Sequence, residues 1–460
     1  MSGRTSRAET RRPAGPRLRI AMVSEHASPL STLGGVDGGG QNVHVDALAR
    51  ALGARGHEVV VHTRRDDPDL PPIVRLAPGV TVHHVDAGPA QPIPKDELLE
   101  HMGQFAEVLR EAWRTTRPDV VHAHFWMSAL ACLDAAPAVD APVAVTFHAL
   151  GSVKRRHQAE ADTSPASRLA DERRIAHDAD RIIATATEEL AELRDMGATD
   201  ARVSVVPCGV DTRHFSPVGP QAPRGDLPHR LLTISRLVPR KGVDDAIRAA
   251  AQLPHCELVV AGGPAPEALE HDPEVRRLRR LAASLDVLDR VRFVGAVPRP
   301  DVPALIRSAD LVLCLPWYEP FGIVPLEAMA CGRPVVGAAV GGLLDTIEDG
   351  RTGLLVPPRT PDAAALAVRR LLSSPGLRTA MGEQGPRTAA ERYDWARVAE
   401  ATEAVYHELV LGAPLAELAT PLPTSRKAGT AAAAGGARGT VPVAAATVRP
   451  TRRAGAGVRR

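Results

Sequence analysis

Cysteine and aromatic residues are scarce in this chain of 460 residues, and neither sign of charge is in clear excess. Phenylalanine, tryptophan and tyrosine together make up 3% of the sequence, and the formal net charge is +2 at pH 7. A charge so close to neutral argues against a nucleic-acid partner. The five cysteines are scattered without a C-x-x-C pair, which argues against a zinc site or a disulfide framework and favours a reducing cytosol. They are Cys132, Cys208, Cys256, Cys314 and Cys331.

Long apolar runs are also absent. None reaches the ~18 residues that a membrane-spanning helix needs, so we expect no integral membrane segment. The N-terminus is basic, but no apolar stretch follows before Pro16, so it does not resemble a secretory signal. These absences favour a cytoplasmic protein. Peripheral contact with a membrane surface stays open, because composition does not report on it.

The rest of the composition is that of a globular protein, with 44% hydrophobic and 24% charged residues. The length favours two to three domains. Residues 1–16 are rich in Arg, Pro, Gly and Ser, and residues 413–460 are rich in Ala, Gly, Pro, Thr and Arg, so both ends are predicted to be disordered. For the basic tail, a passive extension is favoured over binding to nucleic acid or anionic lipid.

Between these ends, short β-branched runs alternate with longer amphipathic segments such as residues 41–55 and 95–115. This alternation predicts an α/β protein with parallel sheets covered by helices on both faces, and two series of runs predict two doubly wound domains. The first series of expected strands is residues 18–24, 58–63, 120–122, 143–147, 181–184 and 203–206. The second series is residues 231–235, 257–261, 291–294, 311–315, 334–337 and 353–356.

The Pro- and Gly-rich residues 216–228 separate the two series and predict a linker between domains at residues 17–215 and 229–390. Doubly wound sheets bind ligands beyond the carboxyl ends of their strands. Two facing sheets would therefore hold one active site in the cleft between them.

A glycine cluster follows the first expected strand, and a helix is expected to begin near Gln41. Glycine amides can approach an anion closely, and a helix N-terminus adds partial positive charge, so this loop suits a diphosphate. It matches neither the G-x-G-x-x-G nor the P-loop pattern, and a simple flexible turn is the alternative. The cluster consists of Gly34, Gly35, Gly38, Gly39 and Gly40.

Residues 235–242 place two cations, Arg236 and Lys241, between a strand end and a helix start, where both can face the cleft. Two cations there can neutralise a nucleotide diphosphate as it leaves. A solvated basic turn is the alternative.

Residues 317–327, W-Y-E-P-F-G-I-V-P-L-E, carry Glu319 on an expected turn and Glu327 in the first turns of an expected helix. Carboxylates accept hydrogen bonds from sugar hydroxyls, and backbone amides near Gly322 can meet phosphate oxygens. Compensation of the helix dipole is a simpler explanation for Glu327. It does not explain Glu319.

Together these motifs resemble family 4 of the retaining glycosyltransferases, over about residues 18–410. The resemblance implies the GT-B fold, in which two Rossmann-like domains face each other with the acceptor on the N-terminal side and the donor on the C-terminal side. It also implies a helix within residues 391–412 that crosses back to the first domain. The supporting segments are the E-x7-E of residues 319–327, the R-x4-K of residues 236–241, the glycine pair near the first strand, and residues 261–263, 334–342 and 349–353.

The resemblance assigns roles on the donor side. It implies that Arg236 and Lys241 bind the donor diphosphate, that Glu319 holds sugar hydroxyls, and that Glu327 binds the ribose. Other residues would meet the phosphates, the nucleoside or the base mainly through their backbone. They are Gly39, Gly40, Val297, Gly322, Ile323 and Val324.

His148, in the segment V-T-F-H-A-L-G, matches a family histidine that ends a strand at the cleft. The resemblance implies that it bonds a donor hydroxyl and helps to position the transition state, although a lone histidine after an apolar strand is commonly structural. Retention of configuration is implied, with the departing diphosphate taking the acceptor proton. No metal cofactor is implied, and Asp67 and Asp69, in a Pro-rich loop, would make a poor metal cage.

The N-terminal half is most similar to the inositol-phosphate N-acetylglucosaminyltransferases of the mycothiol pathway and, more distantly, to sucrose-phosphate synthases. The similarity lies in residues 39–45, the P-K-D-E-L around Lys95, residues 122–126, and the residues before Arg168. It implies that Asn42 contacts the acceptor, and that Lys95 and Arg168 hold its phosphate.

The chain departs from that subgroup at Phe125, where the subgroup has tyrosine, and at Ala149, where it has threonine. We expect Phe125 to line the acceptor site. Each lost hydrogen-bond donor would cost about 1 kcal/mol or more if the acceptor kept a phosphate, which argues against inositol phosphate. We expect a polar small molecule or saccharide, with or without a phosphate. The basic residues 154–156 either compensate or form a solvated loop.

The predicted function is therefore transfer of a hexosyl or N-acetylhexosaminyl group from a UDP-sugar, or less favourably a GDP-sugar, to a polar acceptor. Narrower alternatives are an inositol-phosphate N-acetylglucosaminyltransferase and a GDP-mannose-dependent mannosyltransferase. Alternatives of other classes are a sugar-nucleotide epimerase of the same architecture and a non-catalytic sugar-nucleotide-binding protein. A homodimer stays open.

Overall fold

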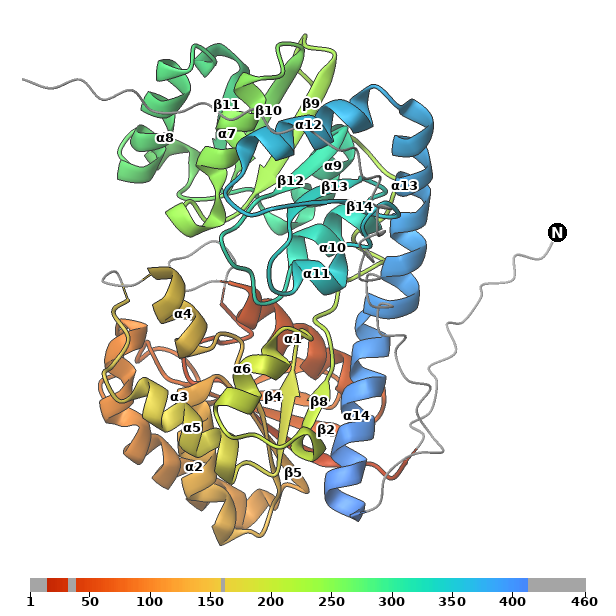
Figure 1. Ribbon diagram of the computed structural model, residues 1–460. Coiled ribbons are helices and arrows are strands. Elements are labelled where there is room, and N and C mark those ends of the chain that lie inside the picture. The colour runs from red at the N-terminus through yellow and green to blue at the C-terminus, as the bar shows by residue number, and fades with distance from the viewer. Residues whose placement is uncertain (1–14, 32–38, 159–161, 413–460) are drawn as a thin grey trace, which may run out of the picture. The chain divides into compact units, whose positions relative to one another are not determined.

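The computed structural model describes residues 15–31, 39–158 and 162–412 of the chain (Figure 1). Nearly all of the lead-in at residues 1–16 and the whole tail at residues 413–460, both predicted to be disordered, lie outside the described residues. So do Gly34, Gly35 and Gly38 of the glycine cluster.

Within the described residues, the N-terminal lobe is built on an eight-stranded sheet of order β3-β4-β2-β1-β5-β6-β7-β8. Its strands pair in parallel, apart from β3, which is antiparallel to β4. The strands are β1 (Arg19–Val23), β2 (Glu58–Arg64), β3 (Ile73–Ala77), β4 (Val80–Val85), β5 (Val120–His124), β6 (Val143–Thr146), β7 (Arg181–Ala184) and β8 (Val203–Val205).

The C-terminal lobe is built on a parallel sheet of order β11-β10-β9-β12-β13-β14. Every residue of β5 in the first sheet and of β10 in the second is buried, as expected for strands covered on both faces. The strands are β9 (His229–Ile234), β10 (Cys256–Ala261), β11 (Val291–Gly295), β12 (Leu311–Cys314), β13 (Val335–Ala338) and β14 (Gly353–Val356).

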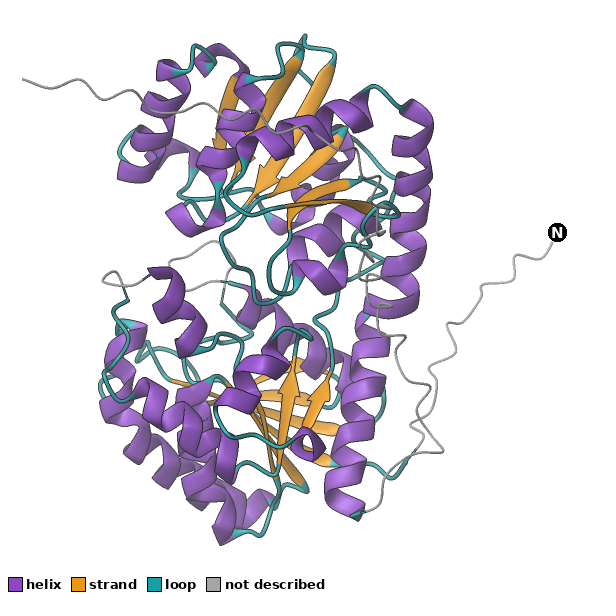
Figure 2. Ribbon diagram, in the orientation of Figure 1, coloured by secondary structure: helices purple, strands orange, loops and turns teal. Residues whose placement is uncertain are grey.

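Helices lie on both faces of each sheet (Figure 2). Those of the N-terminal lobe are α1 (Gly40–Ala54), α2 (Met102–Thr116), α3 (Trp126–Ala135), α4 (Gly151–Gln158), α5 (Arg168–Asp178) and α6 (Glu189–Asp195). Those that follow are α7 (Val243–Ala251), α8 (Pro273–Ser284), α9 (Val302–Ser308), α10 (Ile323–Ala330), α11 (Leu343–Thr346), α12 (Pro361–Leu372), α13 (Pro375–Thr388) and α14 (Trp395–Leu411).

The last helix, α14, begins after a π-helical turn at Ala389–Tyr393, and the carboxylate of Asp394 caps it by accepting a hydrogen bond from the backbone N–H of Ala396 at 2.9 Å. Helix α14 then packs against α1 and β5 of the N-terminal lobe. The predicted crossover helix is therefore confirmed.

Polar contacts hold α14 in that place. The phenolic oxygen of Tyr406 lies 2.6 Å from Nδ1 of His122 on β5, and both side chains are buried. The buried carboxylate of Glu403 pairs with Arg55 and lies 3.1 Å from Nε2 of His57. These groups fix the register of α14 on the N-terminal lobe, because each would be left buried without its partner if the helix slid.

Every strand expected from the sequence is present, with ends that differ by two residues or fewer. Strands β3 and β4 were not expected. Strand β3 is an edge strand in a Pro- and Gly-rich stretch, and its Ile73 is 57% exposed, so it lacks the buried β-branched run on which the prediction depended. Strand β4 alternates buried with half-buried residues along most of its length, a weaker signal than a fully buried strand provides.

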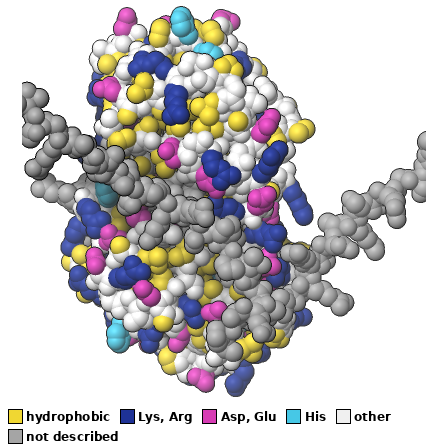
Figure 3. All heavy atoms as spheres, turned by 45° about the vertical axis from the view of Figure 1, so that its right-hand side comes forward, with side chains coloured by type: hydrophobic (Ala, Val, Ile, Leu, Met, Phe, Trp, Pro, Cys, Tyr) yellow, Lys and Arg dark blue, Asp and Glu magenta, His cyan; other side chains and the backbone are white. Residues whose placement is uncertain are grey.

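Among the helices of the described residues, none combines the length and the apolar character needed to cross a membrane. Over the face of the molecule drawn in Figure 3, basic, acidic and apolar side chains are intermixed.

Candidate functional site

A cavity of about 300 Å³ is lined by residues of both lobes. On the N-terminal side its walls follow the ends of β1, β5 and β6, and on the C-terminal side those of β9 and β12. These are the carboxyl ends of parallel strands, where doubly wound sheets place their ligands. The cavity therefore lies where the topology of the two sheets predicts a binding site.

An ion pair between Lys241 and Glu319 forms the centre of the C-terminal wall. Burial opposes ionisation of Glu319, but the charge and hydrogen bond of Lys241 outweigh it, so the pKa of Glu319 lies below its usual range. Burial also lowers the pKa of Lys241, although Glu319 counteracts that effect. The pair keeps a negative and a positive group charged side by side at the edge of the cavity.

Two glycines let the loops that carry this pair approach their neighbours. Gly242, which follows Lys241, has a φ of +66°, and a Cβ there would lie 1.9 Å from the carbonyl oxygen of Leu315. Gly341 has a φ of +49°, and a Cβ there would lie 2.1 Å from the carbonyl oxygen of Glu319. Any larger residue would push the loops apart and separate the ion pair.

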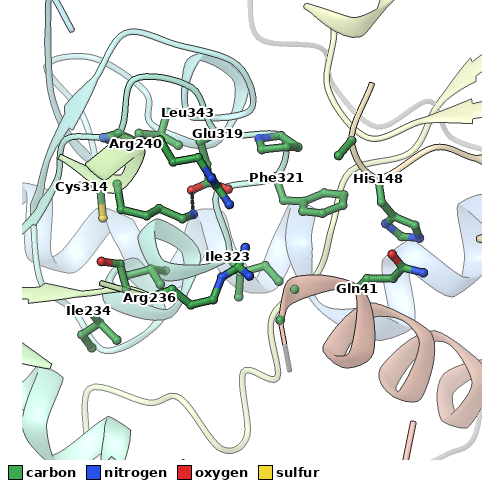
Figure 4. Close-up of a pocket in the computed structure, with 18 of the residues that line it drawn as sticks. Gln41, His148, Ile234, Arg236, Arg240, Cys314, Glu319, Phe321, Ile323 and Leu343 are labelled. Carbon is green, nitrogen blue, oxygen red and sulfur yellow. Dashed lines mark hydrogen bonds and ion pairs between the residues drawn. The ribbon is translucent and has the colours of Figure 1, made fainter. Parts of the chain in front are cut away.

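Two arginines extend the positive charge of this wall. Arg236 and Arg240 both line the cavity, and the Arg240 guanidinium lies over the ring of Tyr318, with 5.1 Å between its Cζ and the ring centroid. Figure 4 shows these arginines on one side of the cavity and Gln41 and His148 on the other. A ligand with two or more negative charges would find its complement on the arginine side.

Helix α10 begins at the C-terminal wall of the cavity. Gly322 is its N-cap residue, and Ile323 and Val324, the first residues of the helix, line the cavity. Backbone N–H groups in the first turn of a helix have no partner within the helix and suit an anion.

Glu327, in the second turn of α10, is 2% exposed and pairs with Arg299. Arg299 begins the short η8 (Arg299–Asp301) that follows β11, and its Cζ lies 4.7 Å from the ring centroid of Phe215. Burial raises the pKa of Glu327, while Arg299 opposes that rise. Arg299 is therefore the cation that makes a buried carboxylate tolerable at this position.

His148 lies on the opposite wall, two residues after the end of β6, with a φ of +61°. A histidine in the left-handed region is uncommon, and such strain tends to persist where it serves a function. Nε2 of His148 lies 2.9 Å from Nδ1 of His124, and its own Nδ1 is buried without a hydrogen-bond partner among the described residues. The ring of Phe321, from the C-terminal lobe, packs edge to face against the ring of His148, with 5.2 Å between the ring centroids.

Burial lowers the pKa of His148 well below its usual range, and the neighbouring His44, His122 and His26 lower it further. The pKa of His124 is lowered in the same way. His148 is therefore a neutral imidazole at ordinary pH, able to hydrogen-bond a hydroxyl group without bringing charge to the cavity.

The start of α1 completes this wall. Gly39 is its N-cap, and a Cβ on Gly40 would lie 3.3 Å from Cδ1 of Ile323, so this helix N-terminus faces α10 across the cavity. Asn42 lines the cavity, but its side chain already makes two hydrogen bonds within the protein. Its Oδ1 accepts from the backbone N–H of Gly39, and its Nδ2 donates to the carbonyl oxygen of Ser28. Gln41 donates to the carbonyl oxygen of His124 at 3.2 Å, which ties α1 to the histidines.

Phe125 and Lys95 line the far end of the N-terminal wall, with 5.3 Å between the Lys95 Nζ and the Phe125 ring centroid. Arg168 lies behind Phe125 and does not line the cavity. Its guanidinium pairs with Glu172 at 2.8 Å and donates to the carbonyl oxygen of Ala149 at 2.6 Å. Of the two cations predicted to hold a phosphate, Lys95 therefore lies at the cavity surface, whereas Arg168 is paired within the N-terminal lobe.

Most of the site residues predicted from the sequence line this one cavity. The exceptions are Gly322, Glu327, Val297 and Arg168, which are not among the lining residues. The predicted roles of all these residues stay predictions. Asp67 and Asp69 lie in an exposed loop outside the cavity, where Asp67 accepts a hydrogen bond from the backbone of Asp69.

Sequence reasoning missed several residues at the site. Phe321 and Arg240 lie inside the motifs of residues 317–327 and 235–242, where neighbouring charged residues give the stronger functional signal. Arg299 follows the end of β11, and a position after a strand end is the sequence feature that could have predicted a place at the site. The same feature applies to His26, which follows β1.

Two protein families match the two lobes. Residues 38–214 match the family described as Glycosyltransferase Family 4, and residues 222–388 match the family described as Glycosyl transferases group 1.

Individual relatives match over nearly the whole chain. The D-inositol 3-phosphate glycosyltransferase of Acidothermus cellulolyticus is 39% identical over 88% of this chain and 93% of its own, and that of Kineococcus radiotolerans is 40% identical over 85% and 95%. Among solved structures, the sucrose-phosphate synthase of Thermosynechococcus elongatus is 31% identical, with a TM-score of 0.78 over 86% of this chain and 100% of its own.

Proposed function

The chain belongs to family 4 of the glycosyltransferases and is a hexosyltransferase with the GT-B fold, and from this premise we propose that it moves a hexosyl or N-acetylhexosaminyl group from a UDP-sugar to a hydroxylated small molecule or saccharide with retention of configuration. The observation that carries the proposal is the difference between the two walls of the cavity: the C-terminal wall carries Arg236, Arg240 and Lys241, whereas the N-terminal wall carries a neutral histidine and one lysine, Lys95.

The donor occupies the C-terminal wall. Its diphosphate lies between Arg236, Lys241 and the first turn of α10, where side-chain cations and backbone N–H groups surround it. Glu319 accepts hydrogen bonds from sugar hydroxyls, and Glu327, held by Arg299, accepts those of the ribose.

The chemistry follows from charge stabilisation and positioning. As the bond between the sugar and the diphosphate breaks, negative charge grows on the leaving phosphate beside Lys241 and Arg236, where prearranged cations lower the barrier. The acceptor hydroxyl attacks from the same face and gives its proton to the departing phosphate oxygen. His148, uncharged, hydrogen-bonds the sugar and holds the reacting atoms in register. No step of this scheme requires a metal.

The acceptor occupies the N-terminal wall, and its chemistry follows from the side chains there. Phe125 and Ala149 offer no hydrogen-bond donor, and the guanidinium of Arg168 is engaged by Glu172 and the backbone. A phosphate would find one lysine, Lys95, among the cavity-lining residues on this side. Neutral hydroxyl groups are therefore favoured over a phosphate in this part of the cavity.

Inositol phosphate is the second candidate acceptor. It is favoured by the names of the relatives that are 39% and 40% identical, and by Lys95 at the cavity surface. Repacking of Phe125 would bring Arg168 to the same space, since its Cζ lies 5.2 Å from the Phe125 ring centroid.

A two-part experiment tests the proposal. Thermal shifts of the purified protein with UDP, GDP and ADP identify the base, because a ligand that binds only the folded state raises the melting temperature with concentration. Release of nucleoside diphosphate is then measured with UDP-sugars and a set of acceptors that pairs each polyol with its phosphate, beginning with inositol. We expect the largest shift with UDP and faster transfer to the neutral member of a pair. Stabilisation by GDP alone would assign a GDP-sugar, and turnover only with inositol phosphate would select the second candidate.

We also propose that the enzyme works in a reducing compartment. All five cysteines are free, and four of them are buried. Burial raises the pKa of Cys208 to about 12, which leaves an unreactive thiol.

A further inference from the structure

His124 lies next to His148, and the proposed function gives it no role. It ends β5, is 0% exposed and does not line the cavity. Its Nδ1 lies 2.9 Å from Nε2 of His148. The planes of the two rings differ by 27°, with 5.1 Å between the centroids, so the hydrogen bond runs from the edge of one ring to the edge of the other. Because His124 occupies Nε2 of His148, Nδ1 is the ring nitrogen of His148 that is left for a ligand.

The two facing nitrogens share one hydrogen. Burial lowers the pKa of both histidines well below the usual range, so both rings are neutral and each ring carries one hydrogen. In the first arrangement, Nδ1 of His124 donates to Nε2 of His148, and the hydrogen of His148 is then on its Nδ1. In the second arrangement, Nε2 of His148 donates to Nδ1 of His124, and the hydrogen of His124 is then on its Nε2.

The surroundings of the two outer nitrogens favour the first arrangement. Nε2 of His124 and Nδ1 of His148 are both buried, and neither has a hydrogen-bond partner among the described residues. A hydrogen on Nε2 of His124 would stay unsatisfied inside the lobe, and such orphaned N–H groups are rare. A hydrogen on Nδ1 of His148 can instead be satisfied by a ligand, because His148 lines the cavity, where its ring lies beside that of Phe321 (Figure 4). The hydrogen-bond balance therefore leaves an N–H group of His148 for a bound ligand to accept.

We propose that His124 is a positioning residue for the transfer reaction. By donating a hydrogen bond to Nε2 of His148, it fixes the tautomer in which Nδ1 of His148 donates to a hydroxyl oxygen of the donor sugar. The inference rests on the proposed function, in which His148 hydrogen-bonds the sugar, and it adds the direction of that bond and the residue that sets it. The other tautomer would present a lone pair, and the sugar hydroxyl would have to turn its own hydrogen towards the ring.

Two variants of His124 separate this role from simple packing. His124→Phe keeps an aromatic ring at the end of β5 but removes Nδ1, and His124→Asn keeps an N–H group that can donate to His148. His62→Phe is the matched control. His62, on β2 of the same lobe, is also buried, accepts a hydrogen bond from the indole N–H of Trp113 at 3.2 Å, and does not line the cavity. Each protein is assayed with a UDP-sugar and with a series of UDP-sugars that each lack one hydroxyl of the sugar.

We expect His124→Phe to lower kcat/KM by about tenfold with the complete sugar, as for misorientation of one buried hydrogen bond. With one deoxy donor, the one that lacks the hydroxyl bound by His148, the variant should fall less than about twofold below the wild type, because the bond that it disturbs is already absent. His124→Asn should recover most of the loss, and the acceptor KM should stay unchanged in both variants. His62→Phe should lose stability but keep its kcat/KM with every donor.

The tautomers are measured by two-bond ¹⁵N–¹H correlation NMR on the wild-type protein with UDP bound. The resonances of the two rings are assigned by their absence from His124→Asn and from His148→Phe. We expect hydrogen on Nδ1 of both rings and on Nε2 of neither.

Two results would overturn the inference: a wild-type spectrum with the hydrogen of His148 on Nε2, or a His124→Phe variant that loses no activity or loses it equally with the complete sugar and every deoxy donor. The spectrum decides even if His124→Phe does not fold. Wild-type protein that binds UDP but transfers sugar from no UDP-sugar would instead count against the proposed function, so the two failures are distinguishable.

Discussion

The two walls of the cavity differ in how their polar groups are kept in place. The C-terminal wall holds carboxylates and cations in pairs, Lys241 with Glu319 and, behind the lining, Arg299 with Glu327. The N-terminal wall holds neutral imidazoles, and the buried carboxylate of Glu25 is hydrogen-bonded by His26 and by the hydroxyl of Ser128. A charged diphosphate meets three cations on the C-terminal side, whereas the N-terminal side, with Lys95 as the cation among its lining residues, suits hydroxyl groups better.

The difference teaches how one cavity can hold two unlike substrates. Lys241 keeps the pKa of Glu319 below its usual range despite burial, so in the proposed mechanism this pair is already charged when negative charge grows on the leaving group. Neutral hydrogen-bonding groups can hold an acceptor hydroxyl without competing for the same diphosphate. Variants on each wall should therefore change different kinetic constants.

The largest effect is expected on the cationic wall, from Lys241→Ala. In the proposed mechanism, loss of a prearranged cation beside the leaving group should lower kcat/KM by about 100- to 1,000-fold, and the half-buried Glu319 would be left without its partner. Steady-state release of nucleoside diphosphate measures this. Arg276→Ala, on the exposed face of α8, serves as the matched loss of a cation from the same lobe. Turnover that survives Lys241→Ala unchanged would remove the donor from this wall.

Arg299→Ala should raise the donor KM by about tenfold, the size expected when a charged hydrogen bond is lost. Arg299→Ala should also change the pH dependence of the donor KM. Burial already raises the pKa of Glu327 and Arg299 opposes the rise, so removal of Arg299 raises that pKa further. In the proposed site, donor binding needs the ionised carboxylate of Glu327, so it is strong above the pKa of Glu327 and is lost as the pH falls through that pKa. The loss should therefore begin at a higher pH in the variant than in the wild type.

Donor KM measured across pH tests this pairing, with Arg299→Lys as the variant that keeps the charge. Parallel pH profiles for the wild type and Arg299→Ala would show that Arg299 does not control the ionisation of Glu327.

A smaller effect is expected when the N-terminal wall is given further hydrogen-bond donors. Phe125→Tyr and Ala149→Thr should each shift the ratio of kcat/KM for a phosphorylated over an unphosphorylated acceptor by about fivefold, the worth of one hydrogen bond of about 1 kcal/mol. Donor KM should not move. The ratio for inositol phosphate and inositol, measured side by side, checks this, and a ratio unmoved in both variants would place the acceptor elsewhere.

The smallest kinetic effect is expected at the crossover helix. Tyr406→Phe removes the hydrogen bond to buried His122, behind the N-terminal wall, and should lower the free energy of unfolding by about 1 kcal/mol while kcat stays within about twofold of the wild type. Chemical denaturation measures the first and turnover the second. A large loss of kcat without loss of stability would mean that α14 acts on the histidines in a way that the contacts do not explain.

The same comparison explains what could be predicted from the sequence. The strands were found because buried parallel strands are continuous β-branched runs, and β3 and β4 were missed because an edge strand and its neighbour are not. The residues of the C-terminal wall could be predicted from two short motifs, residues 235–242 and 317–327, because neighbours in these motifs are also neighbours in space.

The N-terminal wall is assembled from residues far apart in the sequence, and no short pattern links them. Ser128, more than a hundred positions from Glu25, is an example. Whether a cation faces the cavity or an internal partner depends on packing, which is why the engagement of Arg168 by Glu172 could not be deduced from a motif. Arg299 was missed for the same reason, because its partner on α10 is brought to it by the folded sheet.

The most direct test of the central claim is a transfer reaction followed by ¹H NMR. The purified protein is incubated with a UDP-hexose or UDP-N-acetylhexosamine and an unphosphorylated polyol, and the anomeric proton of the product is compared with that of the donor. We predict stoichiometric release of UDP and, as for the retaining members of the family, a product with the donor's anomeric configuration. An inverted product, or a sugar nucleotide epimerised without transfer, would contradict it.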